Sequence, residues 1–348
     1  MRYQNVYIEG MGYEIPSNVV TTEAIDSQLA PVYSKLGMQP GSLEVMTGLR
    51  ERRFWDDGTR PSEAATKAAV KALNNASMVP DQIGALLNCS VCRDYLEPAT
   101  ATVIARRLEI SPDTILFDVS NACLGFATGL SVAANIIELG QAKAVLVVSS
   151  EAASEVVENT IKALLDKPSE ALFLASIPSL TLGSASVAFL LVHSSLQKKG
   201  IRFLGGATLN DSQQSELCLW GPDTGFPSKV NHTMMTDGKV LLEKGAVLAK
   251  RTWASFLNEV PIDPKQIDRT FCHQVGILHR NIVFNALGLD VSRDYTTYEY
   301  LGNTGSAAMP TTLAVGIEKR AFLPGQTAVM MGIGSGLVCT MYGLKWEA

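Results

Sequence analysis

The sequence lacks the features that mark nucleic-acid-binding, disulfide-bonded and membrane-spanning proteins. Its 348 residues carry a formal net charge of −5 and include no block rich in lysine and arginine, so we do not expect nucleic acid as a partner. The six cysteines show no spacing typical of disulfides, and the single C-x-x-C pair, Cys89 and Cys92, has no second pair to complete a zinc site. The most apolar stretch, residues 177–192, contains several serine, threonine and glycine residues and is too short to cross a bilayer. The N-terminal segment alternates like a strand rather than a signal peptide, and we expect a soluble protein of the reducing cytoplasm without a membrane span.

Two stretches of the chain repeat at a fixed distance, which indicates an internal duplication. Aligning Pro80 on Pro264 gives an offset of 184 residues (264 − 80), and each proline precedes an apolar strand, within residues 79–91 and 263–275. The same offset places Ala144–Val147 on Ala328–Met331, two further apolar strands. With 47% hydrophobic residues, the chain has enough apolar material for two such units. Chance similarity between strand-rich segments is the alternative.

Each half is predicted to be an α/β unit. Helices over Ser62–Asn75 and Leu241–Val260 precede the repeated strands, and this alternation is typical of sheets covered on both faces. We expect an N-terminal half over residues 1–195 and a C-terminal half over residues 196–348, with the active site between them. Residues 151–180 break the repeat and are predicted to form an inserted helical or loop segment, whose apolar side chains either line an acyl pocket or serve ordinary packing. Residues 210–232 are polar and rich in Gly, Pro and Ser, which predicts a long surface loop.

Cys123 lies where a predicted strand, Thr114–Val119, gives way to a predicted helix, Leu124–Leu139. The unpaired N–H groups and the dipole at the first turn of a helix stabilise an anion, so we expect a thiolate that is accessible near neutral pH. The small neighbours Ala122 and Gly125 leave room for a substrate. A buried, inert thiol is the alternative.

Two further polar residues follow predicted strands of the C-terminal half. His273 comes directly after the repeated strand, and Asn303 opens a small-residue helix at an offset of 180 from Cys123 (303 − 123). Taken alone, His273 could equally be a structural histidine. No comparable context surrounds the other three histidines, His193, His232 and His279.

The chain resembles the thiolase superfamily, and within it the ketoacyl synthase III-like branch. The resemblance covers nearly the whole chain in the right order, and five segments carry it: Thr47–Arg53, Asn121–Phe126, Cys272–Val275, Leu301–Ala307 and Gly332–Gly336. It implies the thiolase fold, an α/β fold in which two pseudo-symmetric α-β-α-β-α halves form a five-layered structure. It also implies a homodimeric acyltransferase that forms carbon–carbon bonds from CoA thioesters, with no metal and no redox cofactor.

The same resemblance assigns a role to each candidate site residue. Cys123 would accept an acyl group, because a thiolate exchanges one thioester for another at little thermodynamic cost. His273 and Asn303 would each donate a hydrogen bond to one thioester oxygen and so stabilise the enolate that a Claisen condensation requires. The backbone of Ser335 would form an oxyanion hole with the Cys123 N–H, although a plain tight turn is the alternative at this position.

A loop after the first repeated strand, residues 90–100, resembles that of the olefin-pathway thiolases (the OleA family), which join two fatty acyl-CoA molecules head to head. In that family the glutamate matching Glu97 reaches into the partner subunit and is the proposed base for the α-proton of the second acyl-CoA. Malonyl-using synthases obtain the carbanion by loss of CO2, whereas a non-decarboxylating condensation must remove a C–H proton and needs a base. The resemblance therefore implies a 2-alkyl-3-oxoacyl product made through an acyl-Cys123 intermediate, in lipid or olefin biosynthesis with further enzymes downstream. A solvated loop carboxylate is the alternative for Glu97.

The sequence is also compatible with three other functions. A decarboxylating 3-oxoacyl-ACP synthase III that uses malonyl-ACP or malonyl-CoA would keep the Cys–His–Asn set and would not need Glu97. An aldol reaction like that of hydroxymethylglutaryl-CoA synthase also pairs a cysteine with a glutamate base. A third class is a non-catalytic subunit of a thiolase heterodimer, although such subunits usually lack a member of the set, and all three are present here.

One departure from the family pattern concerns CoA binding. Many ketoacyl synthase III chains carry a tryptophan and an arginine shortly before the segment that matches Thr47–Arg53, and residues 42–46 contain neither. The remaining candidates for CoA phosphate contacts are Arg50, Arg52 and Arg53, with a solvated basic turn as the alternative.

Overall fold

Ten strands form one hydrogen-bonded sheet in the computed structural model, which describes residues 1–198, 200–221 and 233–347. The N-terminal part of the chain contributes β1 (Val6–Glu14), β4 (Ala85–Asn88), β5 (Ile115–Asp118), β6 (Ala144–Glu151) and β7 (Ala185–His193). The C-terminal part contributes β8 (Ile201–Asn210), β11 (Arg269–Cys272), β12 (Asp294–Tyr295), β13 (Thr327–Gly334) and β14 (Val338–Trp346). Their order across the sheet is β12-β11-β13-β14-β8-β1-β7-β6-β4-β5.

The two sets of five strands are pseudo-symmetric. Counted inward from the two ends of the sheet, β12, β11, β13, β14 and β8 occupy the same positions as β5, β4, β6, β7 and β1. Strand β4 is parallel to β5 and β6, and β11 is correspondingly parallel to β12 and β13. Strands β6 and β13 each pair antiparallel with the last strand of their set, β7 and β14. The two sets meet at β1 and β8, where only two residue pairs are in register, Tyr7 with Arg202 and Ile8 with Ile201. The strands that the sequence repeat aligned, β4 with β11 and β6 with β13, thus occupy equivalent places.

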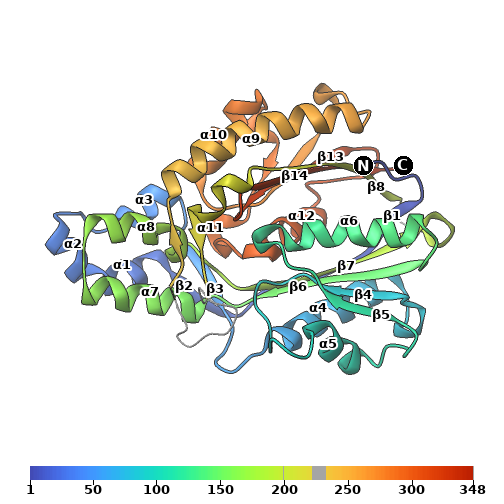
Figure 1. Cartoon of the computed structure of the whole chain (residues 1–348), viewed down its shortest axis with the longest axis horizontal. Coiled ribbons are helices and arrows are strands. Elements are labelled where there is room, and N and C mark those ends of the chain that lie inside the picture. Colours follow the sequence, from blue (N-terminus) through green and yellow to red (C-terminus); the bar gives the residue numbers. More distant parts are fainter. Residues whose placement is uncertain (199, 222–232, 348) are drawn as a thin grey trace.

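Helices and strands alternate in five layers (Figure 1). Helices α4 (Pro61–Ala76) and α5 (Thr100–Leu108) cover one outer face, and α9 (Gly238–Glu259) and α10 (Ile277–Leu287) cover the other. Helices α6 (Gly125–Glu138) and α12 (Ala308–Glu318) lie in the middle layer, between the two sets of strands. This is the five-layered α/β arrangement that the resemblance implied.

The middle layer is built from small and apolar residues because both helices are enclosed by protein. A core cluster joins the two halves there and includes Phe126, Leu130, Val147, Leu313 and Met330. Close packing excludes larger side chains at some positions: a Cβ at Gly129 would lie 2.3 Å from the Sγ of Cys89 on the neighbouring strand end. The start of α6, and with it Cys123, is therefore held rigidly against β4.

The inserted segment of residues 151–180 forms two helices, α7 (Ser154–Asp166) and α8 (Glu170–Leu180). They pack in a separate apolar cluster with α1 (Thr22–Gln28), α2 (Ala30–Leu36) and α3 (Ser42–Thr47). A short hairpin of β2 (Asn18–Thr21) and β3 (Glu51–Phe54) lies beside them. In Figure 1 this group projects from one end of the layered body.

The predicted surface loop over residues 210–232 is only partly within the described residues. Residues 212–217 form a 3-10 turn, and β9 (Cys218–Leu219) pairs with β10 (Met235–Thr236), while residues 222–232 lie outside the described part. Among the helices that the structure describes, none combines the length and the hydropathy needed to cross a bilayer.

Candidate active site

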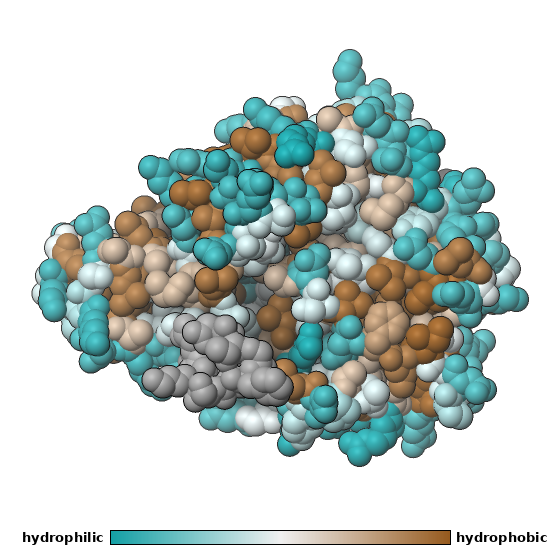
Figure 2. Space-filling model, in the orientation of Figure 1, coloured by the Kyte–Doolittle hydropathy of each residue, from teal (hydrophilic) through white to brown (hydrophobic). Residues whose placement is uncertain are grey.

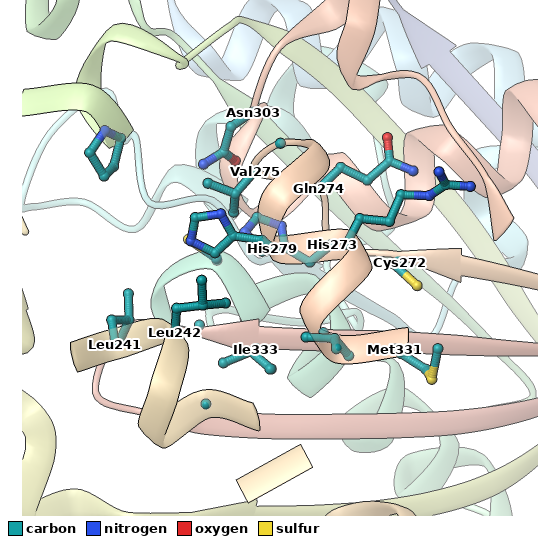
Figure 3. Close-up of a pocket in the computed structure, with 18 of the residues that line it drawn as sticks. Leu241, Leu242, Cys272, His273, Gln274, Val275, His279, Asn303, Met331 and Ile333 are labelled. Atoms are coloured by element: carbon teal, nitrogen blue, oxygen red, sulfur yellow. The ribbon is translucent and has the colours of Figure 1, made fainter. Parts of the chain in front are cut away.

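One cavity brings together four residues that the sequence analysis singled out, namely Cys123, His273, Asn303 and Ser335. Cys123 lies in a 3-10 turn, Ala122–Leu124, between β5 and α6. His273 follows β11, Asn303 follows α11 (Tyr298–Leu301), and Ser335 lies in the turn between β13 and β14. The site therefore combines a cysteine from the N-terminal half with polar groups from the C-terminal half. In Figure 3 His273, His279 and Asn303 lie over an apolar wall that includes Leu241, Leu242 and Ile333.

The turn that presents Cys123 is strained and closely packed. Ala122 has a φ of 44°, a left-handed conformation that non-glycine residues rarely adopt. A Cβ at Gly125 would lie 2.3 Å from the carbonyl oxygen of Cys89, so only glycine fits behind the nucleophile. On the opposite side, a Cβ at Gly334 would lie 3.5 Å from the Cβ of Cys123. The chain thus fixes the position of the thiol from both halves.

The structure corrects the expectation of a low-pKa thiolate. Burial, followed by the charges that Cys218 and Glu151 carry, raises the pKa of the Cys123 thiol to about 12. The backbone N–H groups of Ser335 and of Cys123 itself lower it, but they do not outweigh the loss of solvation. The prediction of an accessible thiolate is therefore wrong, and near pH 7 Cys123 is a neutral thiol. The two N–H groups that act on the sulfur are the pair expected to form an oxyanion hole.

His273 is a neutral imidazole near pH 7. Burial, followed by the positive charge that His279 would carry, lowers the pKa of His273 to about 4. Its backbone N–H donates to the carbonyl oxygen of Met331, 2.7 Å away, which ties the residue to β13. Its Nδ1 is buried and has no hydrogen-bond partner among the described residues. A neutral ring can donate one N–H to a substrate oxygen without the cost of burying a charge.

The titration of His273 predicts how acid affects the fold. Its pKa is about 4 in the folded protein, whereas the ordinary value of 6.5 applies to the unfolded chain. Between these two pH values the unfolded chain binds more protons than the folded protein, so the free energy of unfolding falls as the pH drops. The variant His273→Gln cannot titrate and should lose less stability across this window, by about 2 kcal/mol. Urea unfolding of both proteins at about pH 7 and about pH 4.5 measures the difference. An equal fall in the two proteins would contradict the prediction.

Asn303 is oriented by three hydrogen bonds. Its backbone N–H donates to the oxygen of Thr181 (2.8 Å), and its carbonyl oxygen accepts from Gly183 (2.9 Å). Its side-chain Oδ1 accepts from the backbone N–H of Gly305 (3.0 Å). Because the amide oxygen is used in this turn, the Nδ2 group is the one left to donate in the cavity.

Two buried side chains that the sequence analysis did not single out hold the polar groups in place. The hydroxyl of Ser306 accepts from the N–H of Phe126 and donates to the oxygen of Cys89, each at 2.8 Å, and so joins the Asn303 turn to the first turn of α6. Gln274 Oε1 accepts from the N–H groups of Thr297 (2.8 Å) and Tyr298 (2.9 Å), which fixes the start of α11. Both residues stand beside predicted site residues in the matched segments, and that adjacency was the available signal.

A second cavity of about 970 Å³ adjoins the first, of about 140 Å³. The two cavities are adjacent, and seven residues border both: Pro178, Thr236, Gly238, Leu242, Val275, Gly276 and His279. Helix α8 of the inserted segment lines the larger cavity through Leu174, Ala175 and Ile177, whereas Phe173 and Leu180 pack in the core. One face of α8 thus lines a cavity, and the other face packs in the core. An apolar cavity beside the one that Cys123 borders suits a fatty acyl chain.

Glu97 is not part of this cavity within its own chain. Its loop follows β4 and is anchored at residues 91–92 and again at Asp94, whose carboxylate accepts from the N–H and the hydroxyl of Ser62. At the other end, Asp118 accepts from the N–H groups of Thr100 and Ala101. Residues 95–98, including Glu97, are exposed between these anchors.

The three arginines proposed for CoA binding have different environments. Arg50 is exposed, and Arg53 is half-buried and pairs with Glu51 at 2.8 Å. Arg52 is fully buried, and its guanidinium donates to Thr22 Oγ1 (3.1 Å) and the oxygen of Leu180 (2.9 Å). The prediction is therefore wrong for Arg52, which holds α1 against the end of α8. In the described part of the chain, no group of three or more His, Cys, Asp and Glu side chains is arranged to hold a metal ion.

Known proteins resemble this chain in sequence and in structure. Residues 117–174 match the family described as 3-Oxoacyl-[acyl-carrier-protein (ACP)] synthase III, and residues 257–346 match its C-terminal family. An acyl-CoA:acyl-CoA alkyltransferase of Shewanella oneidensis is 40% identical and covers 99% of this chain and 100% of its own. One of Xanthomonas campestris is 33% identical and covers 99% and 100%.

Solved structures of X. campestris OleA agree with this likeness. The cerulenin-bound form has a TM-score of 0.93 at 33% identity and covers 99% of this chain and 98% of its own. A cysteine-to-serine variant with bound lauric acid and lauroyl-CoA has a TM-score of 0.91 at the same identity and covers 99% and 100%.

Proposed function

The chain belongs to the acyl-CoA:acyl-CoA alkyltransferase (OleA) family of condensing acyltransferases, which has the thiolase fold, and we propose that it joins two fatty acyl-CoA molecules without decarboxylation. One observation carries the proposal: Cys123, His273 and Asn303 border one cavity in a chain that is 40% identical to such an enzyme over 99% of its length. The product is a 2-alkyl-3-oxoacyl thioester, which is open to hydrolysis to the β-keto acid.

In the first half-reaction, the Cys123 sulfur attacks the thioester carbon of one acyl-CoA. The oxygen of the tetrahedral intermediate receives hydrogen bonds from the N–H groups of Ser335 and Cys123. The thiol proton is transferred to the departing CoA thiolate, so the step exchanges one thioester for another and leaves acyl-Cys123 and free CoA. The acyl chain lies in the apolar cavity beside α8.

In the second half-reaction, a base removes the α-proton of a second acyl-CoA. His273 and Asn303 donate to the oxygen of the resulting enolate and hold its negative charge. The α-carbon then attacks the acyl-Cys123 thioester, the carbon–carbon bond forms, and the Cys123 thiolate leaves and regains a proton. Neutral donors suit this step, since an imidazolium would favour protonation of the enolate.

We assign the base to Glu97 of the partner subunit in a homodimer. Strand β5 ends the sheet and leaves one edge unpaired among the described residues, which is a common site of strand association. Exposed apolar side chains lie on this strand and on the loop that carries Glu97, namely Ile115 (41%) on β5 and Tyr95 (45%) and Leu96 (78%) on the loop. A second copy packed on this edge covers these side chains and takes up Glu97 from the exposed loop.

The proposed reaction needs no further cofactor and fits a cytoplasmic enzyme. The two half-reactions use only CoA thioesters and side chains, so we propose no metal and no redox cofactor. The six free cysteines fit a reducing cytoplasm. The name of the olefin-pathway family suggests that downstream enzymes consume the product. Arg50 and Arg53 remain candidate contacts for CoA phosphate.

An assay with one acyl-CoA tests the function. The purified protein incubated with myristoyl-CoA alone should release more CoA than there is enzyme, and mass spectrometry should find the condensed product or its β-keto acid. Addition of malonyl-CoA or malonyl-ACP should leave the rate unchanged. If carbon–carbon bond formation instead requires a malonyl donor, the protein is a decarboxylating 3-oxoacyl synthase, the activity that the matched family models name.

A further inference from the structure

Glu151, at the end of β6, has a buried carboxylate beside the catalytic cavity that the proposed reaction does not use. The residue is 5% exposed. Its negative charge raises the pKa of the Cys123 thiol. A buried carboxylate is costly unless it is fully hydrogen-bonded, and its partners therefore indicate what it is for.

The carboxylate binds the start of the loop that carries Glu97. Its Oε1 accepts from the N–H of Val91 (2.9 Å) and its Oε2 from the N–H of Cys92 (3.1 Å). Ala152, the next residue, exchanges two hydrogen bonds with the Cys92 thiol, each at 3.4 Å. Four hydrogen bonds thus fasten residues 91–92 to the end of β6.

The same carboxylate packs against the turn that orients Asn303. A Cβ at Gly305 would lie 3.3 Å from the Cγ of Glu151 and 3.4 Å from its Cδ. The N–H of Gly305 is the group that donates to Asn303 Oδ1. Glu151 therefore contacts two of the segments whose side chains act in the condensation step, the Glu97 loop and the Asn303 turn.

We propose that Glu151 is a positioning residue for condensation, because it holds the base of the exposed loop so that Glu97 reaches the partner site in a fixed orientation. This proposal rests on the proposed function of Glu97. Burial raises the pKa of Glu151 to about 7. Above that pH its ionised carboxylate accepts from two backbone N–H groups at once, and such charge-assisted bonds are stronger than neutral ones. A glutamine of the same shape has a single acceptor oxygen and places an NH2 group against one of the two N–H donors. The variant Glu151→Gln therefore loosens the loop and leaves the Cys123 turn in place.

The test separates the two half-reactions. In Glu151→Gln, acylation of Cys123, measured as the burst of CoA and as the acyl adduct by intact mass, should fall by no more than about twofold, since loss of the Glu151 charge lowers the pKa of the thiol. The rate at which the acyl-enzyme is consumed by a second acyl-CoA should fall by about tenfold. The matched control is Glu158→Gln, an exposed glutamate on α7, which should change neither rate. Equal losses in acylation and condensation would mark a merely structural role and would overturn the proposal.

A double-mutant cycle with Glu97→Gln decides whether Glu151 acts through the loop. If it does, Glu151→Gln should lower the residual condensation of the Glu97→Gln protein by no more than about twofold. A full tenfold loss in that background would overturn the proposal and leave the proposed function intact. A wild-type rate of condensation in the single variant Glu151→Gln would do the same. If Glu97→Gln condenses normally, both proposals fail, because no base remains for Glu151 to position.

Discussion

Replacing Cys123 by alanine is expected to abolish acyl transfer and condensation together. Both half-reactions of the proposed mechanism require a bond to the Cys123 sulfur, and loss of a covalent nucleophile lowers turnover by about ten-thousandfold or more. The fold should persist, because alanine fits within the space of the cysteine. Intact-mass measurement after incubation with myristoyl-CoA should find one acyl group on the wild type and none on Cys123→Ala.

Cys218 provides the matched control for this experiment, because it borders the same cavity and is also a free thiol. The variant Cys218→Ala should still gain the acyl group. An adduct that persists in Cys123→Ala would place the nucleophile elsewhere. A wild-type protein that gains no adduct from any fatty acyl-CoA would favour the non-catalytic subunit of a heterodimer.

The local patterns of the chain were sufficient to place Cys123. The predicted strand over Thr114–Val119 corresponds to β5 (Ile115–Asp118), and the predicted helix over Leu124–Leu139 corresponds to α6 (Gly125–Glu138). Such boundaries depend on neighbouring residues alone, namely apolar runs and small side chains. The meeting of Cys123, His273 and Asn303 in one cavity could be predicted only from the order of the family motifs, since these residues lie up to 180 positions apart (303 − 123).

The pKa of the nucleophile could not be predicted from the local sequence. The helix start that favours a thiolate is visible in residues 121–125, whereas the burial that overrides it depends on residues distant in the chain, such as Gly334, which packs beside Cys123 from 211 positions later (334 − 123). Arg52 is a similar case. Residues 51–54 look like a basic surface turn, yet alternate side chains of β3 are buried, and Arg52 points to partners on α1 and α8. In both cases long-range packing decides the chemistry of the group.

Replacing Glu97 by glutamine is the second change with a large expected effect. The protein should still form acyl-Cys123, because Glu97 does not line the cavity of its own chain. Condensation should fall by about a hundredfold or more, since an amide cannot accept the α-proton. Mass spectrometry should therefore find an acyl-enzyme that persists in the presence of a second acyl-CoA. Rapid turnover of that acyl-enzyme would show that Glu97 is a solvated loop carboxylate.

Mixing two inactive variants tests whether Glu97 acts across the subunit boundary. In a heterodimer of Cys123→Ala and Glu97→Gln subunits, the intact Cys123 lies in the subunit that lacks Glu97, and its partner supplies that glutamate. Random exchange of subunits should therefore restore about a quarter of the wild-type rate, because half of the dimers are mixed and each has one complete site. If Glu97 acted within its own chain, every site would lack one of the two groups and the mixture would stay inactive. The restored rate thus distinguishes a site shared between subunits from one that a single chain completes.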